Sequence, residues 1–171
     1  MSKKQLACEL VPGVRTLKVE SPAFPPGESI PARYTADGAG ISPPLAWDRA
    51  PSEAKELVLL VEDPDAPRAE PFVHWMAYHI DPAATAIPEG VPGPGRPGIP
   101  ARMRQGPNTR GTSGWTPPSP PPRTGPHHYH FELFAIDNHL LLQQQATRDE
   151  LVRAMAGHVI ASGEVVGTYS R

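Results

Sequence analysis

The chain alternates short apolar runs with clusters of turn residues, a pattern typical of a β-sandwich or barrel. The pattern predicts strands near Thr16–Glu20, Leu57–Glu62, Val73–Ile80, Tyr129–Ile136 and His158–Tyr169. The run Leu57–Val61 is apolar at every position, which indicates a central strand covered on both faces.

One short helix is predicted near the C-terminus. Thr147 is followed three residues later by Glu150, the spacing of a capping box, in which each side chain accepts a hydrogen bond from the other residue's backbone N–H. The positions that follow at helical spacing are Leu151, Met155 and His158. Gly157 is expected to end the helix, because glycine readily takes the left-handed backbone conformation. The predicted fold is therefore mostly β with one helix.

Composition supports this fold class and a single domain over residues 1–171, with residues 1–15 as an N-terminal extension. The 24 prolines argue against a helical bundle, because proline inside a helix removes a donor and clashes with the preceding turn. The one cysteine, Cys8, excludes an internal disulfide. No apolar run is long enough for a membrane helix or a signal peptide, so we expect a cytoplasmic protein without membrane insertion.

Charge argues against nucleic acid as a partner and, locally, for small anions. The formal net charge of −2 gives no basic footprint for nucleic-acid binding. The segment Gly90–Pro126 is about half proline and glycine and contains no acidic residue. Its five arginines are Arg96, Arg102, Arg104, Arg110 and Arg123. A segment of one charge sign raises the local concentration of anions, although the same composition also fits a solvated loop.

Acidic residues and a histidine fall at the ends of two predicted strands. Asp63 and Asp65 follow the run Leu57–Val61, where prolines stop the strand and binding residues commonly collect. His74 begins the next strand and faces away from His79, so these two histidines are not expected to share a metal. Each feature alone also fits a structural turn or a structural histidine.

The strand that begins near His127 allows two chemistries. Alternate residues form two sets, one with His127, Tyr129 and Phe131 and the other with His128, His130 and Glu132. The first set can donate hydrogen bonds to an oxyanion. The second offers a His-x-His metal edge without an obvious fourth ligand, so we predict no metal and no cofactor.

Ordered motifs cover nearly the whole chain from Ser21 to Arg171. They are Ser21-Pro22-Ala23-Phe24, Tyr34-Thr35-Ala36-Asp37-Gly38, Ser42-Pro43-Pro44-Leu45-Ala46-Trp47, Asp63–Pro67, His74-Trp75, Asn108, Gly114-Trp115, Pro120-Pro121, His127-His128-Tyr129, Met155-Ala156-Gly157-His158 and Val166-Gly167-Thr168-Tyr169. Each is weak alone, but the ordered set is specific. Together they resemble the phosphatidylethanolamine-binding proteins, and most closely the bacterial branch described as Raf-kinase-inhibitor-like.

The resemblance implies an antiparallel β-sandwich of the Greek-key type with a pocket for phosphate, a phosphoryl group or a phospholipid headgroup. Carried over position by position, it implies ligand-binding roles for Asp63, Asp65, His74, Trp115, Ser119, Pro121, His127 and Tyr129. The chain departs from the family pattern at Pro117 and Arg123, near which relatives usually place glycine, and at Ala36, where many bacterial relatives carry cysteine. Proline removes a backbone donor, so the rim of the pocket is where this chain is expected to differ.

The predicted function is a binding or regulatory protein that holds a small anion and modulates a partner protein. The expected partners are that anion, a phosphorylated protein and a second copy of the chain in a homodimer. We expect Asp63 to orient a histidine or hold it protonated; alternatively, a protonated Asp63 donates to the ligand. The alternative function is a hydrolase of small esters or phosphoesters that uses His127, Asp63 and Tyr129, although the chain has no Gly-x-Ser-x-Gly motif.

Overall fold

Two β-sheets form the core of the computed structural model, which describes residues 3–94 and 97–171 and so leaves Arg96 outside. The larger sheet has the order β1-β9-β8-β4-β5-β7, formed by Arg15–Thr16, Val159–Tyr169, His127–Ile136, Glu56–Asp63, Phe72–Ile80 and Arg104–Gln105 in that order. The smaller sheet has the order β2-β3-β6, formed by Val19–Glu20, Leu45–Trp47 and Ala86–Ile87. The helices are α1 (Ala7–Leu10), the 3₁₀ turn η1 (Ala32–Tyr34) and α2 (Arg148–Met155).

Strand β4 lies between two apolar clusters and is buried at all of its positions. Leu57, Leu59 and Val61 belong to the cluster between the two sheets, together with residues of β2, β3 and β6. Val58 and Leu60 belong to the cluster under the helices. The prediction of a central strand covered on both faces is confirmed, because alternate residues of one strand point to opposite faces.

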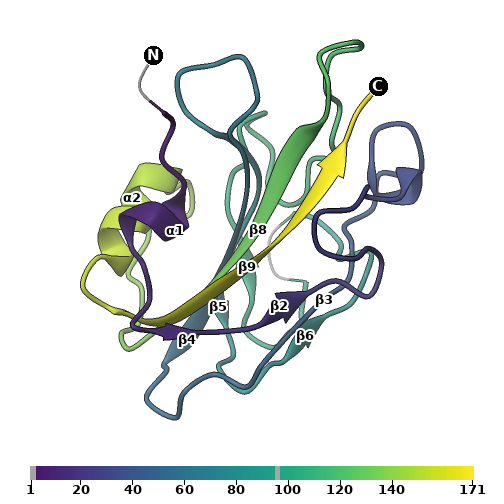
Figure 1. Cartoon of the computed structure of the whole chain (residues 1–171). Coiled ribbons are helices and arrows are strands. Elements are labelled where there is room, and N and C mark those ends of the chain that lie inside the picture. The colour runs from purple at the N-terminus through teal and green to yellow at the C-terminus, as the bar shows by residue number, and fades with distance from the viewer. Residues whose placement is uncertain (1–2, 95–96) are drawn as a thin grey trace.

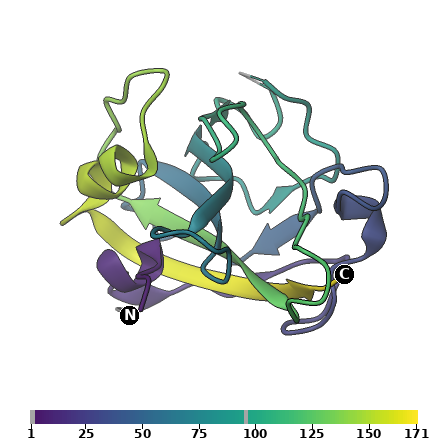
Figure 2. The same ribbon diagram turned by 90° about the horizontal axis from the view of Figure 1, so that it is seen from above.

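The three layers are visible in Figure 1, where α1 and α2 lie on the side of the large sheet away from β2, β3 and β6. Figure 2 shows the same arrangement from above. Ala7 and Val11 pack in the same cluster as Leu151 and Met155, so the segment expected to be an N-terminal extension covers part of the sheet. In the described part of the chain, no helix is both long and apolar enough to cross a bilayer.

The first predicted strand, Thr16–Glu20, is wrong as one element, because the chain crosses between sheets there. Arg15 and Thr16 pair in parallel with β9, so the large sheet is mixed and not purely antiparallel as predicted. Val19 and Glu20 pair with β3 of the small sheet instead. The crossing passes directly over Gly163, where an added Cβ would overlap the carbonyl oxygen of Leu17.

Helix α2 has the predicted capping box. The Thr147 hydroxyl accepts from the Glu150 N–H, and the Glu150 carboxylate accepts from the Thr147 N–H at 2.7 Å. The helix ends at Met155, and Gly157 takes a positive φ of 80°, as expected of a glycine after a helix. His158, predicted at helical spacing, lies beyond the helix, where its Nδ1 is 2.8 Å from Asp137.

Candidate functional site

Most of the predicted site residues surround one small cavity of about 190 Å³. Its lining consists of Asp63, Ala66, Pro67, Phe72, His74, Arg110, Pro117, Ser119, Pro120, Pro121, His127 and Tyr129. The sequence prediction included Asp63, His74, Ser119, Pro121, His127 and Tyr129, and the structure brings these six together. Asp65 and Trp115 were also predicted and do not line the cavity.

The cavity forms at the edge of the large sheet where three neighbouring strands begin or end. Strand β4 runs antiparallel to both β5 and β8, so its last residue lies beside their first residues. Asp63 pairs with Phe72 at the start of β5, and Glu62 pairs with His130 near the start of β8. Sheet register therefore gathers residues that are more than fifty positions apart in sequence.

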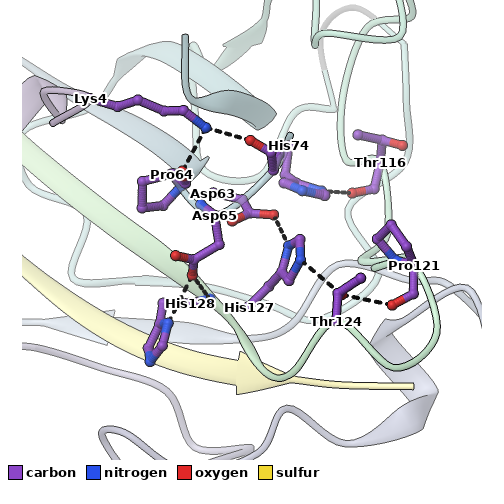
Figure 3. A network of polar contacts seen from close by, with 11 residues as sticks. Lys4, Asp63, Pro64, Asp65, His74, Thr116, Pro121, Thr124, His127 and His128 are labelled. Carbon is purple, nitrogen blue, oxygen red and sulfur yellow. Dashed lines mark hydrogen bonds and ion pairs between the residues drawn. The ribbon is translucent and has the colours of Figure 1, made fainter. Parts of the chain in front are cut away.

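Asp63 and His127 form a buried pair at the floor of the cavity (Figure 3). The His127 Nδ1 lies 2.7 Å from Asp63 Oδ2, and the other oxygen, Oδ1, accepts the backbone N–H of Asp65 at 2.8 Å. Since an ionised carboxylate can only accept, the proton in the first contact belongs to Nδ1 of the imidazole. This pairing fits the expectation that Asp63 orients a histidine, and it gives Asp63 donors on both oxygens.

The second nitrogen of His127 is the atom left to serve a ligand. Its Nε2 lies 3.5 Å from the Thr124 hydroxyl, which itself donates to the Pro121 carbonyl at 2.8 Å. The hydroxyl has one proton, and the shorter contact assigns it to Pro121. Asp63, His127 and Thr124 follow the order of a catalytic triad, but the contact of 3.5 Å is longer than the usual nucleophile-to-base hydrogen bond of about 2.6–3.2 Å.

His74 is buried and neutral. Its Nδ1 lies 2.7 Å from the Thr116 carbonyl, which can only accept, so Nδ1 carries the proton. Burial lowers the pKa of His74 to about 4, despite the opposing effect of that hydrogen bond. A neutral imidazole with a proton on Nδ1 has an acceptor at Nε2. A neutral His74 can therefore accept a hydrogen bond from a ligand but cannot donate one to an anion.

Tyr129 is a hydroxyl donor and not a nucleophile. The residue is 1% exposed, and its ring packs edge-on against His74 at 5.1 Å between centroids. Burial, with the neighbouring charges of Asp63 and Asp65, raises the pKa of Tyr129 well above its usual value. A phenol held in its neutral form donates a hydrogen bond but supplies no phenolate, which disfavours the hydrolase interpretation.

Asp65 turns away from the cavity toward His128, as Figure 3 shows. Its Oδ2 accepts the His128 backbone N–H at 2.7 Å and lies 2.8 Å from the His128 Nδ1. Partial burial acts to raise the pKa of Asp65, but the hydrogen bonds from His128 prevail and lower it. Asp65 thus anchors the start of β8 beside the pocket. Trp115 lies behind the cavity wall. Its ring centroid is 6.1 Å from that of His74, and the ring stacks on Phe131 with 5.9 Å between centroids.

Arg110, Pro117 and Pro120 line the cavity but were not predicted as site residues. Arg110 lines the cavity from the segment 90–126, whereas Arg102 and Arg104 line a separate cavity and Arg123 does not line the pocket. The signal available in the sequence was the one-signed charge of this segment, which does not say which arginine faces inward. Among residues 117–122 only Ser119 is not proline, so it supplies the one backbone N–H of that stretch.

Comparison with known proteins identifies the family of this chain. Residues 20–170 match the family described as phosphatidylethanolamine-binding protein. The chain belongs to the phosphatidylethanolamine-binding protein family.

Relatives of this family with high similarity come from archaea and bacteria. A UPF0098 protein of Pyrococcus horikoshii is 47% identical over 156 residues, covering 91% of this chain and 77% of the relative. A UPF0098 protein of Chlamydia trachomatis is 38% identical over 159 residues, covering 91% of this chain and 99% of the relative. These names state no activity.

Two crystal structures share the fold. One is described as a phosphatidylethanolamine-binding protein homologue from Chlamydia trachomatis, with a TM-score of 0.81 and 38% identity, covering 92% of this chain and 99% of that one. The other is E. coli YbcL, described as a new member of the mammalian family, with a TM-score of 0.82 and 26% identity, covering 91% of this chain and 98% of that one. The mostly β, two-sheet architecture is therefore that of this family.

The opposite face of β8 does not form the His-x-His metal edge considered from the sequence. His128 pairs with Asp65, and the His130 Nδ1 lies 3.0 Å from Glu164 Oε2. Within residues 3–94 and 97–171, the one group of three potential ligands that converges contains Glu132 but neither histidine; it consists of Cys8, Glu132 and Glu164. Strand alternation placed Glu132 on this face correctly, but the strand alone did not predict what would cover it.

Proposed function

We propose that this protein binds a small anion, such as phosphate, a phosphoryl group or a phospholipid headgroup, and through it modulates a partner protein. The observation that carries the proposal is the set of polar groups around one small cavity. Asp63 orients His127, whose Nε2 donates to a ligand when the imidazole is protonated. The neutral Tyr129 hydroxyl donates as well, and Arg110 supplies a positive charge at the rim. Hydrogen bonds to a charged acceptor contribute about 1.5–3 kcal/mol each.

The size of the cavity supports a small ligand. Pockets for drug-sized molecules usually have volumes of about 300–1,000 Å³. A cavity of about 190 Å³ suits a phosphate or a phosphorylated headgroup but not acyl chains. A phosphoryl group on a partner protein meets the same requirement, so the pocket suits a phosphorylated side chain that enters from the rim.

His74 adds a condition on the ligand's protonation. A neutral imidazole with its proton on Nδ1 can only accept at Nε2. A ligand that contacts both His74 and His127 should therefore bring a proton of its own. Hydrogen phosphate, a singly protonated phosphomonoester or an ammonium group meets this condition, whereas a fully ionised phosphate does not.

Calorimetric titration of phosphate and of O-phosphorylethanolamine tests the proposal. The variants are His127→Ala and Tyr129→Phe, each of which removes one polar group from the cavity, and we expect each to weaken binding about 10- to 100-fold. His128→Ala is the matched control, because His128 is adjacent in sequence but faces Asp65 outside the cavity. No binding by the folded wild-type protein would refute the proposal, as would equal weakening by the control.

The partner interaction has its own test. Capture of a protein by the wild type that is competed by phosphate and lost in His127→Ala would support the modulating role. Capture that is indifferent to both would separate the partner surface from the pocket and remove that part of the proposal.

A further inference from the structure

Three side chains with metal-binding atoms converge on the helix-covered face of the large sheet, away from the anion pocket. Cys8 comes from α1, Glu132 from β8 and Glu164 from β9, and one ligand atom of each lies within 4.8 Å of the others. Glu132 and Glu164 are direct partners in the β8–β9 register. The Cys8 backbone N–H donates to Glu132 Oε1 at 2.9 Å, which fixes α1 over the pair.

The second feature of this cluster is the burial of the Glu132 carboxylate. The residue is fully buried, and within the described parts of the chain its Oε2 has no hydrogen-bond partner. An ionised carboxylate removed from water is costly unless it is paired or coordinates a metal. The buried orphaned oxygen is therefore an observation separate from the convergence of the three side chains.

The cationic side chains near the cluster interact with groups other than Glu132. Arg148 pairs with Glu62, whose other oxygen accepts the Ala7 N–H at 2.9 Å. Lys3 pairs with Glu9 at 2.8 Å, and Lys4 donates to backbone carbonyls, one of them that of Pro64 at 2.8 Å. None of these three cations forms an ion pair with Glu132.

We propose that Cys8, Glu132 and Glu164 bind a divalent metal ion of the Zn²⁺ class. A thiolate with two carboxylates is a mixed sulfur and oxygen set, which suits a borderline-soft ion such as Zn²⁺ and disfavours Mg²⁺ and Ca²⁺. A cavity of about 390 Å³ lined in part by Cys8, His130 and Glu164 reaches the cluster, so water can take the fourth position. This inference departs from the sequence-based expectation of no metal and is independent of the anion pocket.

The distance between the Cys8 and Glu164 ligand atoms is close to that expected around such an ion. A tetrahedral Zn²⁺ ion has bonds of about 2.3 Å to a ligating sulfur and about 2.0 Å to a ligating oxygen. These bonds place the sulfur and the oxygen about 3.5 Å apart. The Cys8 Sγ and Glu164 Oε2 are 3.9 Å apart. Glu164 is partly exposed and can move, whereas Glu132 is fixed by burial.

His130 acts as a positioning residue for Glu164. Its Nδ1 lies 3.0 Å from Glu164 Oε2, and its side chain is 17% exposed. A hydrogen bond to a ligating carboxylate restricts its orientation, and such outer partners typically change metal affinity about 10- to 100-fold when removed.

A different state would also satisfy Glu132. Burial and the nearby Glu62 raise the pKa of Glu132 well above its usual value, so a protonated Glu132 can donate in place of binding a cation. The two states differ in a measurable way. A protonated Glu132 leaves Cys8 as a free thiol, whereas metal binding converts Cys8 to a coordinated thiolate.

Titration of the EDTA-treated full-length protein with Co²⁺ separates the two states. Because Cys8 is the one cysteine in the sequence, a thiolate-to-cobalt charge-transfer band in the near ultraviolet can come only from it. We expect the band in the wild type and its loss on addition of Zn²⁺. Cys8→Ser should abolish the band, and Glu132→Gln should weaken Co²⁺ binding at least about 10-fold.

Glu9→Gln is the matched control, because Glu9 is adjacent to Cys8 and glutamine retains an oxygen to accept the Leu6 N–H. The band should survive in this variant. Zn²⁺ should also protect wild-type Cys8 from iodoacetamide, a readout that holds even where Glu132→Gln does not fold. Absence of both the band and the protection in the wild type overturns the proposal. A band that survives Glu132→Gln with unchanged affinity, or that Glu9→Gln abolishes, overturns the ligand assignment.

Discussion

Replacing His74 with asparagine should flatten the pH dependence of this protein's stability. Asparagine can keep a donor near the position of Nδ1, and so keep the bond to the Thr116 carbonyl, but it does not titrate. Burial lowers the pKa of His74 to about 4, against about 6.5 in an unfolded chain. At pH values between these two pKa values, His74 is protonated in the unfolded state but neutral in the folded state. The contribution of the neutral His74 to the free energy of unfolding is therefore complete above pH 6.5 and is lost as the pH falls toward 4.

The magnitude follows from the two pKa values. Linkage gives a loss of about 2.5 kcal/mol in the free energy of unfolding between pH 7 and pH 4.5 from this one group. His74 is almost fully buried, so solvent screening does not reduce the effect much. The variant should lose less stability over the same interval by about this amount, whatever its stability at pH 7.

Urea unfolding of both proteins at pH 7 and pH 4.5, followed by tryptophan fluorescence, provides the measurement. The quantity to compare is the change in unfolding free energy with pH, which cancels any packing cost of asparagine. Equal changes in the two proteins would mean that His74 is not held neutral. The argument for an acceptor at its Nε2 would then fail as well.

Three further predictions concern the fold, and each is checked by urea or thermal unfolding. Gly163→Ala should destabilise the protein by about 3 kcal/mol or more, because the new Cβ overlaps the Leu17 carbonyl oxygen where the chain crosses between sheets; a near-neutral result would contradict that close approach. Leu60→Ala should cost about 3 kcal/mol, since Leu60 is fully buried under the helices; a cost below about 1 kcal/mol would contradict its core position. Thr147→Ala should cost about 1 kcal/mol and lower Tm by about 2–4 °C, because it removes the cap of α2, and an unchanged Tm would argue against the capping box.

The sequence by itself determined the features that depend on local periodicity. The uninterrupted apolar run in β4 required cover on both faces, and the spacing of Thr147 and Glu150 produced the cap of α2. Alternation along β8 correctly placed His127 and Tyr129 on one face and Glu132 on the other. These features follow from the chain's own geometry, so neighbours in sequence are sufficient to predict them.

Ordered motifs added most of the site. Six of the eight predicted residues line the cavity, including the His127 that Asp63 contacts. The two exceptions, Asp65 and Trp115, contact the site from behind: the Asp65 backbone N–H donates to Asp63, and the Trp115 ring packs near His74. A sequence motif identifies residues that belong to one site. It does not distinguish the residues that line the cavity from those that support them.

Tertiary structure decided everything that depends on contacts between distant segments. The partner of each imidazole nitrogen fixes its proton, so the acceptor role of His74 became apparent only with the Thr116 carbonyl in place. Arg110 was selected from the arginines by the path of a loop without periodicity. The split of Thr16–Glu20 and the meeting of Cys8 with Glu132 and Glu164 depend on how the first residues dock on the sheet. Local pattern does not encode these contacts, because they join segments far apart in sequence: 42 residues separate His74 from Thr116, and 124 separate Cys8 from Glu132.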